Sequence, residues 1–466
     1  MQATTAATGM IRQVIPIIPY SVKGKYRNRK TAIVLLADLV FFSLPWLVWH
    51  GAARTGQPLL FDIAHSRFHF FDIVLFPQDL MIFVAVMVFA ATFLFMAAAL
   101  YGRVFCGFFC FQTIWTDAFR AIEKLVQGEA QSRIRWRKQP WDLQRIARVA
   151  LTHALWLALA FATALTFTLY FADARTLIGQ LFTGHAPFAA YSSVIVLTLT
   201  TYVAAGLARD DICRVACPYG KFQSVMQDPA TKTVVYDEAR GERSLGRMAP
   251  DKTLKDPAAR AAKGYGDCID CGYCVNVCPT GIDIRKGFQI DCISCGLCID
   301  ACDNIMESLK LPIGLIRFRE MSHAEQATSA PMLGHQLKKY GYLSILAVCL
   351  GFLVYQLNHL EPFSATIQQQ AQPLATRLAN GDLRSRYIVR LSNKQAEAER
   401  YRLAVEGLPA AMADFEVPAG KTYTYTLNVV LNEAEARSTR QITVSVTPVS
   451  RPDARRKYRL GYVAVL

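Results

Sequence analysis

Charged residues are scarce in this 466-residue chain: they make up 19% of it, whereas a typical soluble domain has about 25%. Hydrophobic residues make up 53%, and the mean hydropathy is +0.21. This composition excludes an intrinsically disordered chain and argues against a purely soluble protein. At roughly 100–200 residues per domain, the length predicts about two to four structural units.

Acidic residues are also few, and the sequence has no nucleic-acid recognition motif. The 51 Lys and Arg residues exceed the 36 Asp and Glu residues, which gives a formal net charge of +15. A basic balance indicates nucleic-acid binding only when it comes with a recognition motif on a basic face. We therefore expect no nucleic-acid partner.

No cysteine follows Cys349, although the chain contains 13 cysteines. The odd number argues against a pure disulfide scaffold. Eight cysteines fall in one stretch, four form two close pairs, and Cys349 lies alone in an apolar run. The simplest interpretation of Cys349 is a small packing residue.

Five apolar runs have the length of a membrane-spanning helix or nearly so, since about 20 helical residues cross a hydrocarbon core of ~30 Å. They are Thr31–Val48, Leu80–Leu100, Ala147–Phe171, Phe188–Leu207 and Tyr342–Leu357. The last run is short and needs flanking residues to complete it, so a buried soluble helix is its alternative. We predict an α-helical transmembrane bundle of about five spans.

Basic residues alternate between abundant and rare in the segments that separate these runs. The rich segments contain Arg12, Lys23, Lys25, Arg27, Arg29 and Lys30, and then Arg103, Arg120, Lys124, Arg133, Arg135, Arg137, Lys138 and Arg145. The poor segments contain Arg54 and Arg67, and then Arg175. Because basic loops stay in the cytoplasm, this pattern predicts a multi-pass protein of the bacterial inner membrane. Most of the net charge is then an orientation signal and a lipid contact.

The runs divide the chain into five predicted parts. They are a cytoplasmic segment 1–30, helices 1–4 within 31–208 with a cytoplasmic loop 102–146, a cytoplasmic segment 209–339, helix 5 at 340–358, and a periplasmic domain 361–466. The cysteine-rich region at about 260–310 lies in the cytoplasmic segment.

Eight cysteines form two CxxCxxCxxxC runs. They are Cys268, Cys271, Cys274 and Cys278, followed by Cys292, Cys295, Cys298 and Cys302. This is the spacing of bacterial two-cluster ferredoxins, an α+β fold in which the fourth cysteine of each run binds the other 4Fe–4S cluster. The predicted ligand sets are therefore Cys268, Cys271, Cys274 and Cys302 for one cluster, and Cys278, Cys292, Cys295 and Cys298 for the second.

Structural zinc is the alternative to iron–sulfur in this region. Zinc sites normally use two separated CxxC pairs or mixtures of Cys and His, which two complete triple runs do not match. The small residues Gly272, Gly296 and Ala301 are expected to let the backbone approach the sulfides. Backbone N–H groups that bond to sulfur would raise the reduction potential.

Four more cysteines form two pairs with i, i+4 spacing, each just after an apolar run. They are Cys106 and Cys110, and Cys213 and Cys217. On a helix such residues share one face, but Pro218 disfavours helical geometry at Cys217, so we expect this pair to cap a helix. Neighbouring basic residues are expected to favour thiolates: Arg103, Arg120, Arg209, Arg214 and Lys221.

These four thiols have several possible roles. Soft thiolates bind Cu(I), zinc or iron–sulfur clusters, so the pairs are candidate copper or redox sites. A third iron–sulfur cluster and inert packing at the membrane surface are the other readings. A disulfide does not suit a reducing compartment.

The C-terminal part has short alternating apolar and polar segments separated by turn signals. The predicted strands are Arg386–Leu391, Tyr401–Val405, Thr422–Val430 and Ile442–Val446. Such a pattern predicts a small antiparallel β-sandwich of immunoglobulin-like architecture. No residue in this part resembles a catalytic group, so we expect the domain to dock a partner or to have a structural role. The absence of cysteine suits an oxidising periplasm.

Together these motifs resemble the CcoG/FixG/RdxA family of cytochrome c oxidase accessory proteins, which are membrane-bound polyferredoxins. The segments that carry the resemblance are Tyr101–Trp115 (YGRVFCGFFCFQTIW), Cys213–Gln223 (CRVACPYGKFQ), Tyr236–Glu242 (YDEARGE), the ferredoxin repeat and the C-terminal domain. The ferredoxin repeat alone is generic, whereas the order of all these segments is specific. One departure is Phe111, which stands where the family usually has proline, so the turn after Cys110 is expected to differ.

The resemblance implies a cupric reductase that uses two 4Fe–4S clusters to reduce Cu(II) to Cu(I) during assembly of cbb-type oxidase. The copper-handling, catalytic thiols of the family map onto Cys106, Cys110, Cys213 and Cys217. The implied partners are oxidase assembly factors, copper chaperones or transporters, and an unidentified electron donor. The resemblance leaves open whether the protein forms a homo-oligomer.

Two other functions stay open at this point. One is a quinol-linked electron conduit similar to the NapH-type membrane ferredoxins, which also pair two CxxxCP motifs with two clusters. The other is a non-enzymatic scaffold for oxidase assembly, in which the clusters are structural or sensing. Copper independence and rapid reduction by a quinol analogue would favour the conduit.

Overall fold

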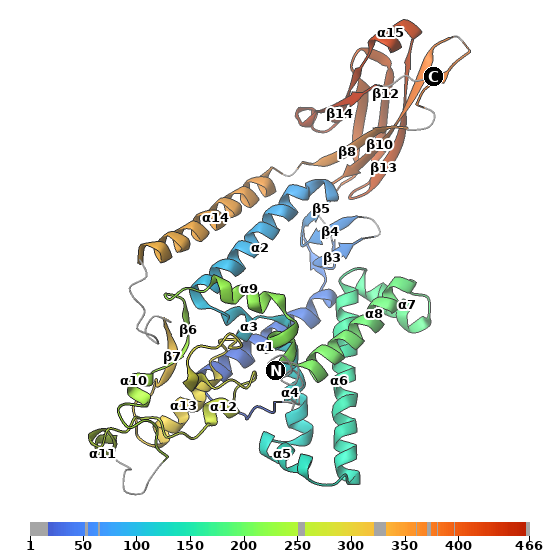
Figure 1. Ribbon diagram of the computed structural model, residues 1–466. Coiled ribbons are helices and arrows are strands. Elements are labelled where there is room, and N and C mark those ends of the chain that lie inside the picture. The colour runs from blue at the N-terminus through green and yellow to red at the C-terminus, as the bar shows by residue number, and fades with distance from the viewer. Residues whose placement is uncertain are drawn as a thin grey trace, which may run out of the picture. The chain divides into compact units, whose positions relative to one another are not determined.

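The computed structural model describes residues 17–51, 55–63, 66–249, 257–320, 332–359, 361–370, 374–379, 381–395 and 397–462 (Figure 1). Arg12 and Arg54, used above for orientation, lie outside these ranges. The chain divides into two compact units. The first comprises Met1–Ser43, Ala85–Tyr170 and Arg175–Gly351, and the second comprises Leu44–Val84, Phe171–Ala174 and Phe352–Leu466.

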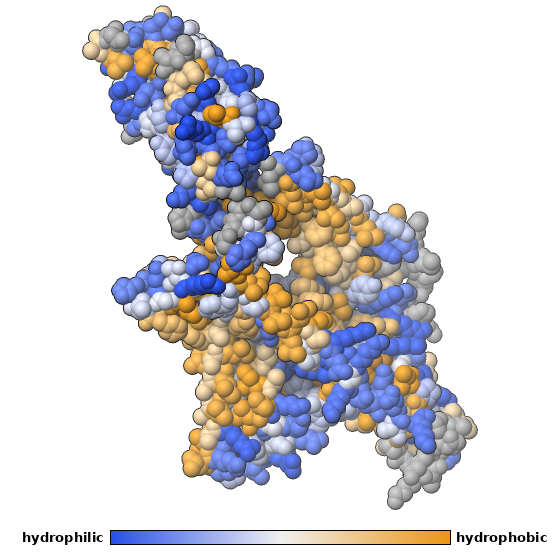
Figure 2. All heavy atoms as spheres, turned by 180° about the vertical axis from the view of Figure 1, so that it is seen from behind, coloured by the Kyte–Doolittle hydropathy of each residue, from blue (hydrophilic) through white to orange (hydrophobic). Residues whose placement is uncertain are grey.

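Four helices in the described part of the chain are long and apolar enough to cross a membrane. They are α2 (Leu80–Tyr101), α6 (Leu143–Leu169), α8 (Phe188–Thr201) with its π-helical continuation η3 (Tyr202–Ala208), and α14 (Met332–Asn358). Their apolar side chains are largely exposed, and Figure 2 shows a broad apolar area on the molecular surface. A surface of this kind is stable against lipid rather than water. The chain is therefore a multi-pass membrane protein.

The first predicted run, Thr31–Val48, does not form one helix. Helix α1 (Lys25–Ser43) begins earlier and includes four basic residues in its first half, and the 3₁₀ turn η1 (Leu44–Trp46) follows it. Pro45 cannot continue a helix because it has no backbone N–H to donate. By length and composition, four of the five predicted runs are candidate spans among the described residues, and α1 is not among them.

Shorter helices pack beside the spans in the first unit. They are α3 (Val104–Phe108), α4 (Phe111–Gln127), α5 (Ala130–Lys138), α7 (Ala174–Thr183), η4 (Ile212–Ala216) and α9 (Pro218–Met226). An apolar cluster that includes Trp115, Phe119, Trp156 and Ala205 joins α4 to α6 and η3. Trp156 also donates its indole N–H to the carbonyl of Phe119 at 3.0 Å. These contacts hold α4 against two spans.

The cysteine-rich region is built on an antiparallel pair of strands and several short helices. Its elements are β6 (Lys232–Tyr236), α10 (Glu238–Gly241), α11 (Pro257–Ala262), α12 (Tyr273–Asn276), η5 (Ile284–Lys286), α13 (Leu297–Ser308) and β7 (Ile316–Glu320). Lys232 pairs with Glu320 and Tyr236 with Ile316 at the two ends of the ladder. Val234 and Ile316 are each 1% exposed, so this small sheet forms the floor of the region.

The second unit contains two small sheets and a β-sandwich. The small sheets are β1 (Trp49–His50) with β2 (Thr55–Gly56), and β3 (Leu59–Asp62), β4 (Arg67–Phe70) and β5 (Ile73–Leu75), followed by the short turn η2 (Pro77–Asp79). The sandwich sheets have the orders β13-β10-β8, with β9 on β10, and β12-β11-β14-β15. Their strands are β8 (Phe363–Gln369), β9 (Thr376–Arg377), β10 (Leu383–Asn393), β11 (Glu399–Val405), β12 (Leu408–Val417), β13 (Thr422–Leu431), β14 (Gln441–Pro448) and β15 (Arg456–Gly461), with helix α15 (Glu433–Ser438) and the turn η7 (Pro452–Ala454).

The sandwich core comes from alternating side chains of its central strands. Tyr387, Val389 and Leu391 of β10 and Tyr401 and Leu403 of β11 are fully buried. β10 pairs with β13 over ten residues, from Leu383 with Leu431 to Ser392 with Thr422. All four predicted strands are confirmed, as β10, β11, β13 and β14. The immunoglobulin-like expectation for this part of the chain therefore agrees with the observed sandwich.

Candidate functional site

The eight ferredoxin cysteines line two cavities beside the floor formed by β6 and β7. Cys268, Cys271, Cys274 and Cys302 line the first, together with Tyr236 and Ile316. Cys278, Cys292, Cys295 and Cys298 line the second, together with Val234 and Cys274. The structure thus brings together the same two sets of four that the spacing predicts. The donor set is entirely thiol and the other lining is mainly apolar, so both cavities fit a 4Fe–4S cubane.

The two runs share one unusual backbone geometry. Asp270 and Ser294, which precede the second cysteine of each run, have φ of 52° and 51°, and Gly272 and Gly296 have φ of 67° and 75°. Left-handed residues on both sides of a cysteine turn the backbone around its thiol. The glycines are needed for this conformation. No protein atom lies within 4 Å of the place where a Cβ of Gly272 would lie, so the positive φ is what favours glycine within the polypeptide itself.

Backbone N–H groups point at the thiols of the second cavity. The backbone N–H of Ser294 lowers the pKa of Cys292 and that of Leu297 lowers the pKa of Cys295, because each favours the thiolate. Burial nevertheless raises the pKa of Cys292 to about 12 and that of Cys295 to about 11. Burial also raises the pKa of Cys274 to about 11 and that of Cys302 to about 12. These thiols therefore hold their protons at neutral pH until a metal displaces them.

The two CxxxC pairs form similar local structures. Cys106 lies within α3, and Cys110 is the residue that caps the N-terminus of α4. Cys213 lies within η4, and Cys217 caps the N-terminus of α9. The prediction that the second pair caps a helix is confirmed.

Phe111 does not change this geometry. Cys110 (φ −65°, ψ 130°) and Cys217 (φ −77°, ψ 111°) both have extended backbone, and Phe111 and Pro218 both occupy the first helical position. The N–H of that position has no partner within the helix, so proline is tolerated there but not required. The expectation that the turn after Cys110 differs is therefore wrong.

The structure brings all four of these thiols into one neighbourhood. Burial raises the pKa of Cys213 to about 12, and Asp210 and the other three thiols raise it further. Burial also raises the pKa of Cys106 to about 11, and the nearby positive charge of Arg103 only partly opposes this. The expectation that the surrounding basic residues favour thiolates is wrong for these two cysteines.

Ion pairing explains why the cations have so little effect. Arg120 pairs with Asp210, Arg209 pairs with Glu123 at 3.2 Å, and Arg214 pairs with Asp211 at 3.5 Å. A cation that already has a carboxylate partner stabilises a nearby thiolate less. Within the described residues, no group of three or more His, Cys, Asp or Glu side chains is arranged to hold a single metal ion. The four thiols are therefore neighbours without forming a closed one-ion site.

The first pair packs tightly against the second ferredoxin run. A Cβ atom on Gly107 would lie 2.6 Å from the carbonyl oxygen of Ile293 and 2.9 Å from the Cα of Cys295. Cys106 and Cys295 also belong to the same apolar cluster, with Val22, Val277 and other buried side chains. Glycine is thus required because two backbones meet here. This contact connects the CxxxC pairs to a predicted cluster ligand.

Arg103 ties the same segments together. It is 3% exposed and donates from Nη1 to the carbonyl of Ile290 at 2.5 Å and from Nη2 to the carbonyl of Cys213 at 3.5 Å. The guanidinium of Arg103 therefore bonds both to the segment just before Cys292 and to Cys213 of the second CxxxC pair. The backbone of Arg103 leads directly into α3, which contains Cys106 of the first pair. The planar guanidinium suits this role because its donors point in fixed, divergent directions.

Gln223 is a site residue that the sequence did not single out. It is fully buried on α9, and its Oε1 accepts a hydrogen bond from the Cys106 thiol at 3.0 Å. The residue closes the quoted segment Cys213–Gln223, so the motif contained it. Its position in the sequence, ten residues after Cys213, does not indicate that it contacts Cys106 of the first CxxxC pair.

Cys349, the remaining cysteine, lies on α14 and is half-buried. It is separate from both groups of thiols in the chain, and none of its neighbours in the sequence is a metal-ligating residue. The prediction of a packing role stays a prediction.

Comparisons with known proteins agree with this geometry. The 4Fe-4S dicluster domain family matches residues 208–321, which implies two 4Fe–4S clusters. The family described as "IG-like fold at C-terminal of FixG" matches residues 353–460. Protein RdxB of Cereibacter sphaeroides is 36% identical over 445 residues, which cover 91% of each chain.

Two further relatives match over most of their length. Protein RdxA of Cereibacter sphaeroides is 36% identical over 412 residues, covering 87% of this chain and 85% of the relative. Nitrogen fixation protein FixG of Rhizobium meliloti is 33% identical over 426 residues, covering 85% and 80%. The matched regions span the membrane helices as well as the two recognised domains.

Proposed function

The chain belongs to the family of RdxA, RdxB and FixG, and on that premise we propose that it reduces Cu(II) to Cu(I) for assembly of the copper centre of cbb-type cytochrome c oxidase. The observation that carries this proposal is the contact of α3, which contains Cys106, with the second ferredoxin run at Gly107, together with the closeness of the other three CxxxC thiols to Cys213. The proposed electron-donating cluster and the proposed copper site would then lie on either side of the contact between α3 and the second ferredoxin run. The dicluster domain alone would support electron transfer but not a substrate.

The twelve cysteines fall into two groups with different proposed roles. Bound 4Fe–4S clusters supply one-electron storage, and the eight ferredoxin thiols would hold them. The thiols of Cys106, Cys110, Cys213 and Cys217 would bind copper as substrate. Reduction of each Cu(II) consumes one electron, and thiolates prefer the Cu(I) that results. Copper would be a substrate of these thiols, to be passed on to a partner after its reduction.

Replacement of Cys106, Cys110, Cys213 and Cys217 by serine tests the site assignment. We expect Cu(II) reduction to be abolished, while the iron–sulfur absorption and the iron content stay at about eight atoms per chain, the number for two 4Fe–4S clusters. The measurements are anaerobic metal counting and a Cu(II)-reduction assay on the same sample. Unchanged copper reduction would refute the assignment, and a drop from about twelve irons to eight would identify a third cluster instead.

Copper affinity should depend on pH. Cys106 and Cys213 have raised pKa values, about 11 and about 12, so both carry a proton at neutral pH. Each proton that Cu(I) displaces makes the apparent affinity rise about tenfold per pH unit. Displacement of the protons of these two thiols alone gives a rise of about a hundredfold per unit between pH 6 and 8, so we expect at least that slope. A competition titration with a Cu(I) chelator measures it, and a pH-independent affinity would contradict binding by these two thiols.

The proposal places the thiols and ferredoxin region in the cytoplasm and the sandwich in the periplasm. The basic residues of the loop between α2 and α6 support this orientation. Oxidase assembly factors and copper chaperones or transporters are the proposed partners. The sandwich offers them a surface without cysteine, and the electron donor reaches the ferredoxin region from the cytoplasm or the membrane.

A quinol conduit is the second candidate, and one cavity favours it. A space of about 380 Å³ lies where α5, α6 and η3 meet. Its aromatic lining is Trp136, Trp141, Trp156 and His153, and its charged lining is Glu123, Arg133, Arg137, Arg145 and Arg209. The Nδ1 atom of His153 and the hydroxyl of Tyr202 are hydrogen-bonded at 2.8 Å. Aromatic walls beside a proton-accepting imidazole suit a quinol ring. One quinol would release two electrons and two protons, enough to reduce two Cu(II).

The two candidates can be distinguished with a quinol analogue. If quinol is the donor for copper reduction, the analogue reduces the iron–sulfur centres and added Cu(II) reoxidises them. If the chain is a conduit for another acceptor, the analogue reduces the centres and Cu(II) has no effect.

A further inference from the structure

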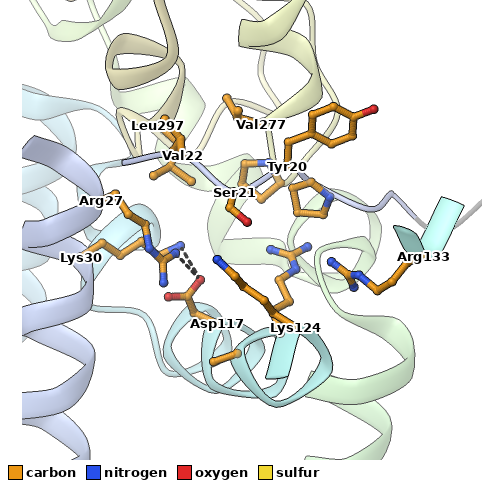
Figure 3. A pocket seen from close by; sticks show the side chains of 14 residues that line it. Tyr20, Ser21, Val22, Arg27, Lys30, Asp117, Lys124, Arg133, Val277 and Leu297 are labelled. Carbon is orange, nitrogen blue, oxygen red and sulfur yellow. Dashed lines mark hydrogen bonds and ion pairs between the residues drawn. The ribbon is translucent and has the colours of Figure 1, made fainter. Parts of the chain in front are cut away.

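A second cavity, separate from the thiols, lies where the segment before α1 meets α4, α5 and the ferredoxin loops. Its volume is about 150 Å³, about ten times the space that one ordered water needs. Tyr20, Ser21 and Val22 form one side, and Val277, Pro279 and Leu297 of the ferredoxin region contribute to its lining. Figure 3 shows charged side chains of α1 and α4 reaching into the space from opposite sides.

The lining is strongly cationic. Arg27, Lys30, Arg120, Lys124 and Arg133 line the cavity, and Asp117 is the one carboxylate among the described residues that do so. Arg27 lies 2.9 Å from Asp117, and the Nζ of Lys30 lies 3.7 Å from the same oxygen, beyond hydrogen-bond distance. Lys30 is nevertheless only 2% exposed. A buried ammonium group with so distant a partner is costly unless another acceptor is present.

Ion pairs outside the cavity do not remove the positive excess. Arg120 pairs with Asp210, Lys124 with Glu129 at 2.8 Å, and Arg133 with Glu123 at 2.6 Å. Glu123 is shared with Arg209, and Asp117 is shared by two cations. Positive charge therefore exceeds negative charge around the space, which favours an anion within it.

Two arginine N–H groups in the lining have no acceptor. The Nε atoms of Arg120 and Arg133 are buried and make no hydrogen bond. Arg133 is 7% exposed as a residue, so water does not replace the missing partner from bulk solvent. Buried donors are nearly always paired, and two orphaned donors on arginines that line one cationic space favour a bound group with at least two acceptor oxygens.

We propose that this cavity binds a phosphate group. Arg120 and Arg133 donate their Nε–H groups to its oxygens, and Lys30 and Lys124 balance its charge. A phosphate supplies several acceptor oxygens and up to two negative charges, which match the orphaned donors and the positive excess. The group comes either from a soluble phosphate compound or from an anionic phospholipid headgroup, since basic pockets beside spanning helices bind such headgroups.

A matched pair of variants on α5 tests the site. Arg133→Lys keeps the charge but removes the orphaned donor, and Arg135→Lys makes the same change at an exposed position two residues away. Inorganic phosphate is titrated calorimetrically into the full-length holoprotein in detergent, against chloride at equal ionic strength. We expect the Kd of Arg133→Lys to rise about tenfold, the loss of one charge-assisted hydrogen bond, and that of Arg135→Lys to stay within about twofold.

Lys124→Gln is the second variant, in case Arg133→Lys lowers the iron content and so indicates misfolding. Lys124 is half-exposed, so its replacement is compatible with folding, and we expect it to weaken phosphate binding about fivefold. Nanodiscs of phosphatidylcholine with and without phosphatidylglycerol distinguish the two sources. Competition by phosphatidylglycerol identifies a headgroup site, and its absence identifies a soluble phosphate. Equal phosphate affinity in the two α5 variants, or no phosphate binding beyond chloride together with no retained phosphatidylglycerol, would overturn the proposal.

Discussion

Removal of iron from the purified protein is expected to unfold the ferredoxin region while leaving the β-sandwich intact. The ferredoxin region rests on one two-stranded sheet, and a sheet of that size is marginally stable alone. Its apolar cluster counts Cys268 and Cys274 among its buried members, so cluster ligands are part of the core itself. Structural metal sites contribute on the order of 10 kcal/mol to folding, more than this region can supply otherwise.

Hydrogen exchange before and after anaerobic chelation measures this effect. We expect backbone amides of α13, β6 and β7 to lose their protection, because their carbonyl partners and the two cavities lose a fixed arrangement. Amides of β10 and β11 serve as the internal control, since the core they share contains no cysteine. Unchanged protection in α13 after complete loss of iron would show that the polypeptide holds the region by itself.

Gly107→Ala is expected to separate the CxxxC pairs from the second ferredoxin run. The added methyl group would lie 2.6 Å from the Ile293 carbonyl oxygen and 2.9 Å from the Cys295 Cα, distances that real Cβ atoms do not adopt. Both obstacles are backbone atoms beside a cluster ligand, so α3 has to move instead. Overpacking of this kind costs about 1–3 kcal/mol, and a displacement of about 1 Å at a reacting site can cost about a hundredfold in rate.

The copper-reduction rate and the melting temperature of the variant test this expectation together. Gly179→Ala on α7 is the matched control, because a Cβ there meets nothing within 4 Å. It should leave the rate unchanged and raise stability by about 0.5–1 kcal/mol through helix propensity. A Gly107→Ala protein with wild-type rate and stability would mean that the two segments are not in contact.

The cluster ligands were predictable because their information is local. Each CxxCxxCxxxC run places three thiols on one turn of chain, and the crossed fourth ligand follows from the known pairing of such runs. Gly107, Gln223 and the bridging role of Arg103 could not be predicted, since each acts on a partner over a hundred residues away in the sequence. Spacing does not encode contacts of that kind.

The fold shows the same division between local and distant information. The predicted sandwich strands include the three central strands β10, β11 and β14, whereas β8, β9, β12 and β15 were missed, and among the strands at sheet edges only β13 was predicted. Edge strands carry polar and charged residues, which weakens the alternation that reveals a strand. The prediction of one helix over Thr31–Val48 was wrong for another reason. Pro45 interrupts the helix, and the hydropathy of the run does not reveal this.

The matching geometry of the two CxxxC pairs has an evolutionary consequence. In each, a membrane-spanning helix leads to a short helix with the first cysteine, and the second cysteine then caps a new helix. Two copies of one unit with the same chain direction are what gene duplication and fusion produce. Phe111 and Pro218 occupy equivalent positions in the two units, so this repeat accepts either residue at the first position of the second helix.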